Sequence, residues 1–230
     1  MGNPANAQSK ESISSKYIAK DSFLVVSIRP NQIASCADQK SETTKYVMNA
    51  IKKFSGLEVK KLDQIILQIG AGKEIEDDDE AVIITMHFSE DIDADAITSK
   101  IGENFDFEKT EKDGKPLYKP SEDDQPCMYF PNKKTVVMCL ESRIGAAMSG
   151  GKGASSKIAK KITSSDHIGI SFDLTNKDQQ ESIEEMMEDL PLGQMGIDSD
   201  LLKNVKQGDI HINLKSDTPM IANMVCKDGK

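Results

Sequence analysis

A strand pattern that occurs twice constrains the fold of this chain more than any other feature of its sequence. Three apolar segments of the first half recur, in the same order, in the second half. The matched pairs are "VSIRP" (26–30) with "ISFDL" (170–174), "DQIILQI" (63–69) with "GDIHINL" (208–214), and "AVIITMHFSE" (81–90) with "PMIANMVCKD" (219–228). A repeat at this spacing predicts two copies of one supersecondary unit.

The first copy alternates strands and helices. Apolar, β-branched runs predict strands at 21–30, 62–70 and 81–90, and apolar residues at helical spacing predict a helix over 41–56. A short helix at 93–104 and a hairpin at 105–120 follow; its Asp113-Gly114 pair suits a type I′ turn. The order β-α-β-β-α-β is the ferredoxin-like split βαβ pattern, in which helices cover one face of an antiparallel sheet.

The second copy stops early. A hairpin at 127–141 and a Gly/Ser-rich stretch follow the first copy, and a helix over 176–191 lies between the strands of the second. We therefore predict an α+β protein of two tandem ferredoxin-like units, the second incomplete. The predicted parts are a disordered lead-in (1–16), a first unit with an added hairpin (17–150) and a truncated second unit (151–230).

The incomplete copy raises the question of what covers its first strand. Without a fourth strand, that strand would lie at a bare sheet edge. Two explanations stay open: the chain is a piece of a longer protein, or the first unit covers the edge.

Composition excludes several classes of protein. The formal net charge is −9, there is no Trp, and the only arginines are Arg29 and Arg143. Nucleic-acid binding depends on Lys/Arg clusters and aromatic stacking, so we expect none. No stretch approaches the roughly 20 apolar residues of a membrane-spanning helix, so we expect no membrane insertion by this segment.

Two acidic clusters are candidate cation sites. Six acidic side chains lie between Glu74 and Glu80, and we interpret them as the solvated tip of a hairpin, because the second copy makes the same connection with a short turn. Asp91, Asp93 and Asp95 have the spacing of a calcium loop, but the Gly and Glu that an EF-hand requires are missing. We interpret them as residues at a helix N-terminus; calcium binding is the alternative.

The remaining candidates favour structural roles. Cys127 and Cys139 flank one hairpin and are a possible cross-strand disulfide, with buried free thiols the favoured alternative. His87, His167 and His211 each lie on or beside a strand without a His partner at metal-ligand spacing. "GAAMSGGKGASS" at 145–156 lacks the Walker A spacing and is interpreted as a linker. We therefore predict no catalytic residue, no cofactor and no metal site.

"YIAKDSFLVVSIRPNQIAS" and "KTVVMCLESRIGAAMSGG" resemble segments of a family of large, uncharacterised secreted or anchored planctomycete proteins with duplicated α+β repeats. The resemblance covers most of residues 17–228, and its motifs are structural. It implies a bacterial, extracytoplasmic setting and transfers no catalytic residue.

Two hypotheses for function follow. The first is a non-catalytic scaffold or protein-interaction module with open strand edges, whose protein partner the sequence does not identify. The second is a hydrolase or small-ligand-binding protein with a site between the two lobes. The sequence leaves the oligomeric state open.

Overall fold

The computed structural model describes residues 15–36, 49, 59–70, 82–101, 106–122, 125–150, 154–175, 205–215 and 220–226. The predicted helix at 176–191 lies outside these residues, as do the acidic run from Glu74 to Glu80, nearly all of the predicted lead-in and, apart from residue 49, the predicted helix at 41–56.

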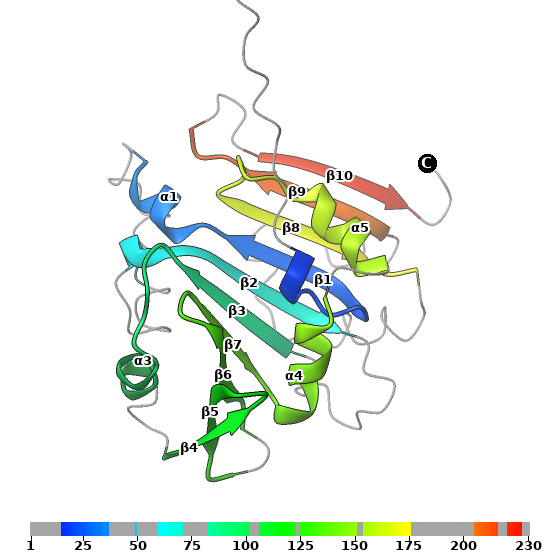
Figure 1. Cartoon of the computed structure of the whole chain (residues 1–230). Coiled ribbons are helices and arrows are strands. Elements are labelled where there is room, and N and C mark those ends of the chain that lie inside the picture. Colours follow the sequence, from blue (N-terminus) through cyan, green and yellow to red (C-terminus); the bar gives the residue numbers. More distant parts are fainter. Residues whose placement is uncertain are drawn as a thin grey trace, which may run out of the picture.

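The described strands form a single open sheet in which every neighbouring pair is antiparallel (Figure 1). The sheet has ten strands in the order β10-β9-β8-β1-β2-β3-β7-β6-β5-β4. In chain order the strands are β1 (Ser22–Ile28), β2 (Leu62–Gly70), β3 (Val82–Phe88), β4 (Phe107–Lys112), β5 (Lys115–Pro120), β6 (Cys127–Asn132), β7 (Thr135–Cys139), β8 (Ile168–Asp173), β9 (Val205–Ile212) and β10 (Met220–Cys226).

The described helices are short. They are α1 (Pro30–Ala34), α3 (Ala94–Ile101), α4 (Glu141–Met148) and α5 (Ala154–Lys161), with single 3₁₀ turns η1 (Ser15–Tyr17) and η2 (Val59–Lys61). The structure therefore confirms an α+β protein with an antiparallel sheet. It also confirms the predicted strands and the turn between β4 and β5, where Asp113 and Gly114 have φ of 53° and 68°.

The ferredoxin-like prediction is wrong. In a split βαβ unit the first two strands are parallel and a third strand lies between them, whereas β1 pairs directly and antiparallel with β2, Val26 lying opposite Leu67. The two predicted units also do not form separate sheets, because β1 pairs with β8 on its other side. An apolar pattern indicates that a strand is buried, but it does not indicate which strand pairs with it. The prediction of the topology failed for this reason.

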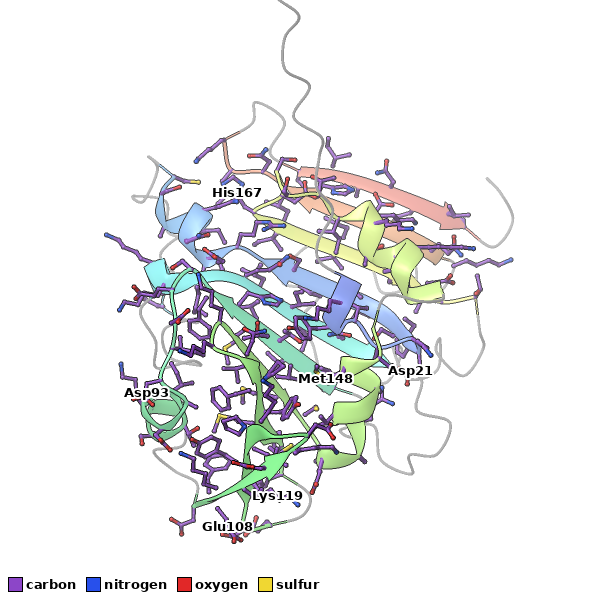
Figure 2. All side chains as sticks on the ribbon, in the orientation of Figure 1. Asp21, Asp93, Glu108, Lys119, Met148 and His167 are labelled. Carbon is purple, nitrogen blue, oxygen red and sulfur yellow. The ribbon has the colours of Figure 1, made fainter. Side chains whose placement is uncertain are left out.

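Helices cover both faces of the sheet, not one as predicted. Successive residues of a strand point to opposite faces. Val136 packs in one core cluster with Ile97 of α3, and Val137 packs in another with Ile144 of α4. Ile158 and Ile162, within and just after α5, cover Val25 of β1 on the face that α4 also covers, and Figure 2 shows side chains filling both faces.

The repeat is visible in the strand register. Val26 lies opposite Leu67, and Leu67 lies opposite Ile84; in the second copy Ile170 lies opposite Ile210, and Ile210 opposite Ala222. Val26 and Ile170, matched in the sequence, also lie opposite each other where β1 meets β8. A local two-fold axis therefore passes between these two residues, and the first unit covers the first strand of the second.

Candidate functional site

The edge strand β10 is the most exposed apolar element of the described structure. Met220 is 62% exposed, Ile221 50% and Val225 54%, and among the described strands β10 pairs only with β9. The opposite edge, β4, has the sequence FEKTEK, in which charged side chains alternate in sign. Charged residues on an edge strand prevent it from pairing with other chains. β4 has this protection and β10, with the uncharged sequence MIANMVC, does not.

The internal repeat shows what lies beside the strand equivalent to β10. That strand is β3, and its outer side pairs with β7, so that Ile84 lies opposite Met138 and His87 opposite Thr135. The equivalent residues of β10, Ala222 to Val225, have no such neighbour among the described residues. The place beside β10 thus corresponds to the place beside β3, which the antiparallel strand β7 occupies.

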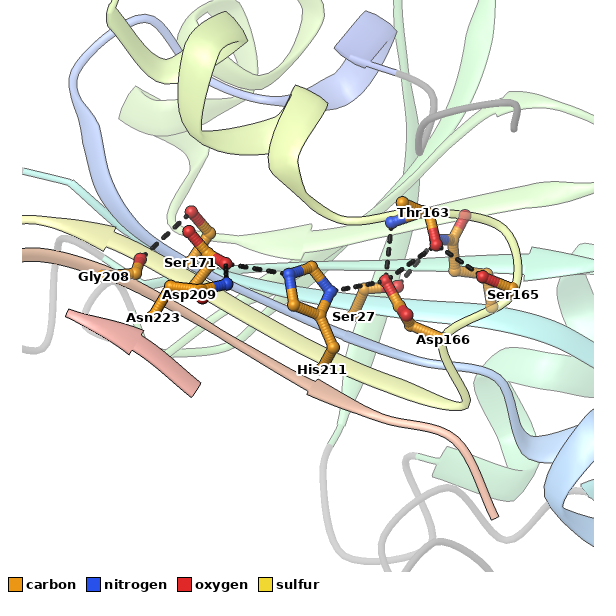
Figure 3. A network of polar contacts seen from close by, with 10 residues as sticks. Ser27, Thr163, Ser165, Asp166, Ser171, Gly208, Asp209, His211 and Asn223 are labelled. Atoms are coloured by element: carbon orange, nitrogen blue, oxygen red, sulfur yellow. Dashed lines mark hydrogen bonds and ion pairs between the residues drawn. The ribbon is translucent and has the colours of Figure 1, made fainter. Parts of the chain in front are cut away.

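A polar network anchors β10 to the rest of the sheet (Figure 3). Asn223 of β10 donates through Nδ2 to Oδ2 of Asp209 on β9 at 2.7 Å. His211 lies between two carboxylates: its Nε2 is 2.8 Å from Oδ2 of Asp209 and its Nδ1 is 2.9 Å from Oδ2 of Asp166. Lys161 at the end of α5 is 3.4 Å from the other oxygen of Asp209. The network therefore ties the exposed strand to β9, to α5 and to the loop before β8.

The contacts within this network stabilise the charged forms of His211 and Asp209. Burial lowers the pKa of His211, but its hydrogen bonds to Asp166 and Asp209 outweigh burial and hold that pKa above its ordinary value. Burial raises the pKa of Asp209, and its bonds to Asn223, His211 and Lys161 outweigh this effect and lower it. Both ring nitrogens of His211 face acceptors, so both carry protons in the cationic form. In that form the imidazole has no free lone pair and donates to both carboxylates.

Close backbone packing also holds β10 in place. A Cβ added at Gly208 of β9 would lie 2.9 Å from the carbonyl oxygen of Asn223 and 2.6 Å from Cζ of Phe172. Neither contact is tolerated by a real Cβ, so the position requires glycine. Gly208 therefore lets β9, β10 and the Phe172 ring of β8 pack together.

His167 contacts a cysteine that is distant in the sequence. Its Nε2 is 3.2 Å from Sγ of Cys36, and both residues are buried. The backbone N–H of Leu214 donates to Nδ1 of His167, so the proton of the neutral ring is on Nε2 and points at the sulfur. The Cys36 thiol in turn donates to the carbonyl of Gln32, and burial lowers the pKa of His167. In this tautomer His167 does not accept the thiol proton.

His87 occupies a third, separate environment. Its Nδ1 is 3.2 Å from Oγ1 of Thr135, and its ring lies 5.3 Å from that of Tyr17. Burial, with Arg29 and Lys16 adding repulsion, lowers the pKa of His87 to about 4. The structure thus brings the three histidines to three different sets of partners. Within the described ranges, no group of three or more His, Cys, Asp and Glu side chains is arranged to hold a metal ion.

The three aspartates of the calcium-like spacing have separate partners. Asp93, at the start of α3 (Figure 2), accepts hydrogen bonds from the backbone N–H groups of Asp95 and Ala96, as a helix N-cap does. Asp95 binds Nζ of Lys109 and the hydroxyl of Tyr118. Asp91 is 3.9 Å from Nζ of Lys133. The contacts of Asp93 are those of the predicted helix N-terminus, and calcium binding stays an untested alternative.

Cys127 and Cys139 lie directly opposite each other on β6 and β7. The turn between the strands has two residues, and an irregularity between Tyr129 and Asn132 restores the direct pairing. Both thiols are free and buried, and Sγ of Cys127 donates to the carbonyl of Cys139 at 2.9 Å. A disulfide between them stays the untested alternative to the favoured free thiols.

Sequence reasoning singled out His167 and His211 but missed Asp166, Asp209 and Cys36. Asp209 and His211 are two residues apart on a strand, which places them on one face, and this spacing is a usable signal. Cys36 and His167 are 131 residues apart, and no local pattern links them.

Comparisons with known proteins identify a fold but no family. No family model matches the chain, and no curated protein matches it by sequence. Crystal form I of TP0453 is similar in structure, with a TM-score of 0.52 at 8% identity over 94% of this chain and 79% of that one. Crystal form III of the same protein has a TM-score of 0.49 at 8% identity, over 94% and 80% of the two chains. At this identity the likeness concerns the fold alone. Among the described helices, none has the length and apolar character needed to cross a membrane.

Proposed function

We propose that this protein is a non-catalytic protein-interaction module that binds an extended partner strand at the free edge of β10. The observation that carries the proposal is the exposure of Met220, Ile221 and Val225 on an edge strand without charged residues. Backbone N–H and C=O groups at a sheet edge bind an extended chain, and side-chain contacts select its sequence.

The partner strand has a defined chemistry in this proposal. β7 has the sequence TVVMC and lies antiparallel on β3, the strand that corresponds to β10. A strand that binds β10 in the same manner is antiparallel, uncharged and rich in β-branched residues. Such residues favour extended conformations and pack well across a sheet.

We also propose an extracytoplasmic setting for the module. The resemblance of most of residues 17–228 to repeats of secreted or anchored planctomycete proteins supports this placement. Fractionation of the native cells, followed by immunodetection of the chain, tests it: recovery in the cytoplasmic fraction would contradict it.

A labelled peptide tests the strand-binding function. The peptide carries the β7 sequence, Thr135 to Cys139 with serine in place of the cysteine, and lysines outside the strand for solubility. Fluorescence anisotropy should show binding to the wild-type chain and at least about tenfold weaker binding to Val225→Lys, because an edge charge opposes pairing. Glu111→Lys on β4 is the matched control and should bind like the wild type. Equal binding by Val225→Lys, or no binding by the wild type at concentrations where it is monomeric, would contradict the proposal.

A further inference from the structure

We infer that the strand bound by β10 is β10 of a second copy of this chain, paired antiparallel across a two-fold axis at Asn223. This inference rests on the proposed strand-binding function and names its partner. Its starting point is that β10 contains no charged residue, so two copies meet along this edge without repulsion between like charges.

The sequence of β10 is compatible with itself in this register. With Asn223 on the axis, Ile221 of each copy lies opposite Val225 of the other, and Met220 lies opposite Cys226. Ile221 and Val225 are 50% and 54% exposed, so this pairing buries apolar surface that one copy leaves in water. Pairs of β-branched residues directly opposite each other stabilise antiparallel strands.

The chain already contains a junction of this kind. β1 and β8 are corresponding strands of the two repeats, and they pair antiparallel with Val26 opposite Ile170 on the local two-fold axis. A β10–β10 junction repeats this arrangement between molecules. It also closes the assembly at two copies, because a two-fold interface uses the same surface on both partners and the remaining edge is the charged strand β4.

Cysteine trapping tests both the partner and the register. The variant Met220→Cys places a new thiol opposite natural Cys226 of the second copy, and mild oxidation with diamide should give a covalent dimer on a non-reducing gel. Ala222→Cys places its thiol opposite Met224 instead, so it should give much less dimer. Adding Cys226→Ser to Met220→Cys, or adding Val225→Lys, should abolish the dimer.

Sedimentation velocity of the unmodified chain gives an independent readout. The wild type should show a concentration-dependent monomer–dimer equilibrium, and Val225→Lys should stay monomeric at concentrations at least about tenfold higher. A wild type that stays monomeric and binds the β7 peptide would overturn the inference while leaving the proposed function intact. A monomer that binds no peptide, but floats with vesicles of phosphatidylcholine and phosphatidylglycerol, would overturn both.

Discussion

His211 and Asp166 join two segments of the chain through a contact of 2.9 Å between Nδ1 and a carboxylate oxygen. The same oxygen accepts the backbone N–H and the hydroxyl of Thr163. Through Asp209 the imidazole also reaches β10. The protonation of one side chain is therefore connected to the anchoring of the strand that we propose as the binding edge.

Replacing His211 by glutamine should destabilise the fold by about 1–3 kcal/mol at neutral pH, since it leaves two mostly buried carboxylates without their shared cation. The pKa of His211 is raised in the folded chain, so its contribution is fully present below the ordinary pKa of about 6.5 and is lost as the pH rises through the raised value. Urea unfolding of both proteins at a series of pH values measures this difference. A gap between them that grows toward alkaline pH would contradict the assignment.

The contribution of His87 to stability is expected to change with pH in the opposite direction. Its pKa is lowered to about 4 in the folded chain, so the unfolded chain takes up the proton first as the pH falls below 6.5. Stability should therefore fall between pH 6.5 and about 4, by roughly 3 kcal/mol at most from this residue. His87→Leu should show a shallower loss over the same interval in urea unfolding. Parallel curves for the two proteins would show that His87 does not titrate in this manner.

The sequence predicted the strands better than their arrangement. Apolar runs located most of the described strands, because burial of a strand leaves a pattern in its own residues. The hairpin of β4 and β5, whose first strand is charged and exposed, was located by its Asp113-Gly114 turn instead. Pairing depends on a second segment, and Val26 is equally suited to lie beside Leu67 or Ile170, which it does on its two sides. Local patterns contain no information that selects between such partners.

The sequence match of the two repeats was also offset in one strand. The sequence alignment matched Leu67 with Ile212, whereas the strand registers show that Ile210 corresponds to Leu67. A shift of two residues along a strand leaves every side chain on the same face. Both positions are isoleucine, so the apolar pattern does not distinguish them.

Of the candidate site, the sequence showed the apolar composition of β10 but not its place at the edge. The sequence of Met220 to Cys226 is typical of a buried strand, as is that of the corresponding strand β3. Its exposure follows from the absence of a β7 equivalent beside it among the described strands, which is a property of the whole sheet.

Calcium should leave the melting temperature unchanged. Asp93 is occupied as the N-cap of α3, and Asp95 is held by Lys109 and Tyr118, so binding calcium would break these contacts. Thermal melts with and without millimolar calcium measure the effect, with magnesium as the matched control. A rise in melting temperature that is specific to calcium, and is lost in Asp93→Asn, would establish the calcium site instead.

Substitution of Gly208 should loosen β10 selectively. Gly208→Ala forces a Cβ against the backbone carbonyl of Asn223 and the ring of Phe172, at a cost of about 1–3 kcal/mol. Amide hydrogen exchange should be faster in the variant than in the wild type, and this increase should be larger in β9 and β10 than in β3 and β7. Gly145→Ala is the matched control, because it lies on the exposed side of α4 with no atom near its added Cβ. It should stabilise the chain by up to about 1 kcal/mol through the higher helix propensity of alanine. If Gly208→Ala were as stable as the wild type, with unchanged exchange in β10, the close packing of β9, β10 and Phe172 would not be what holds the edge strand in place.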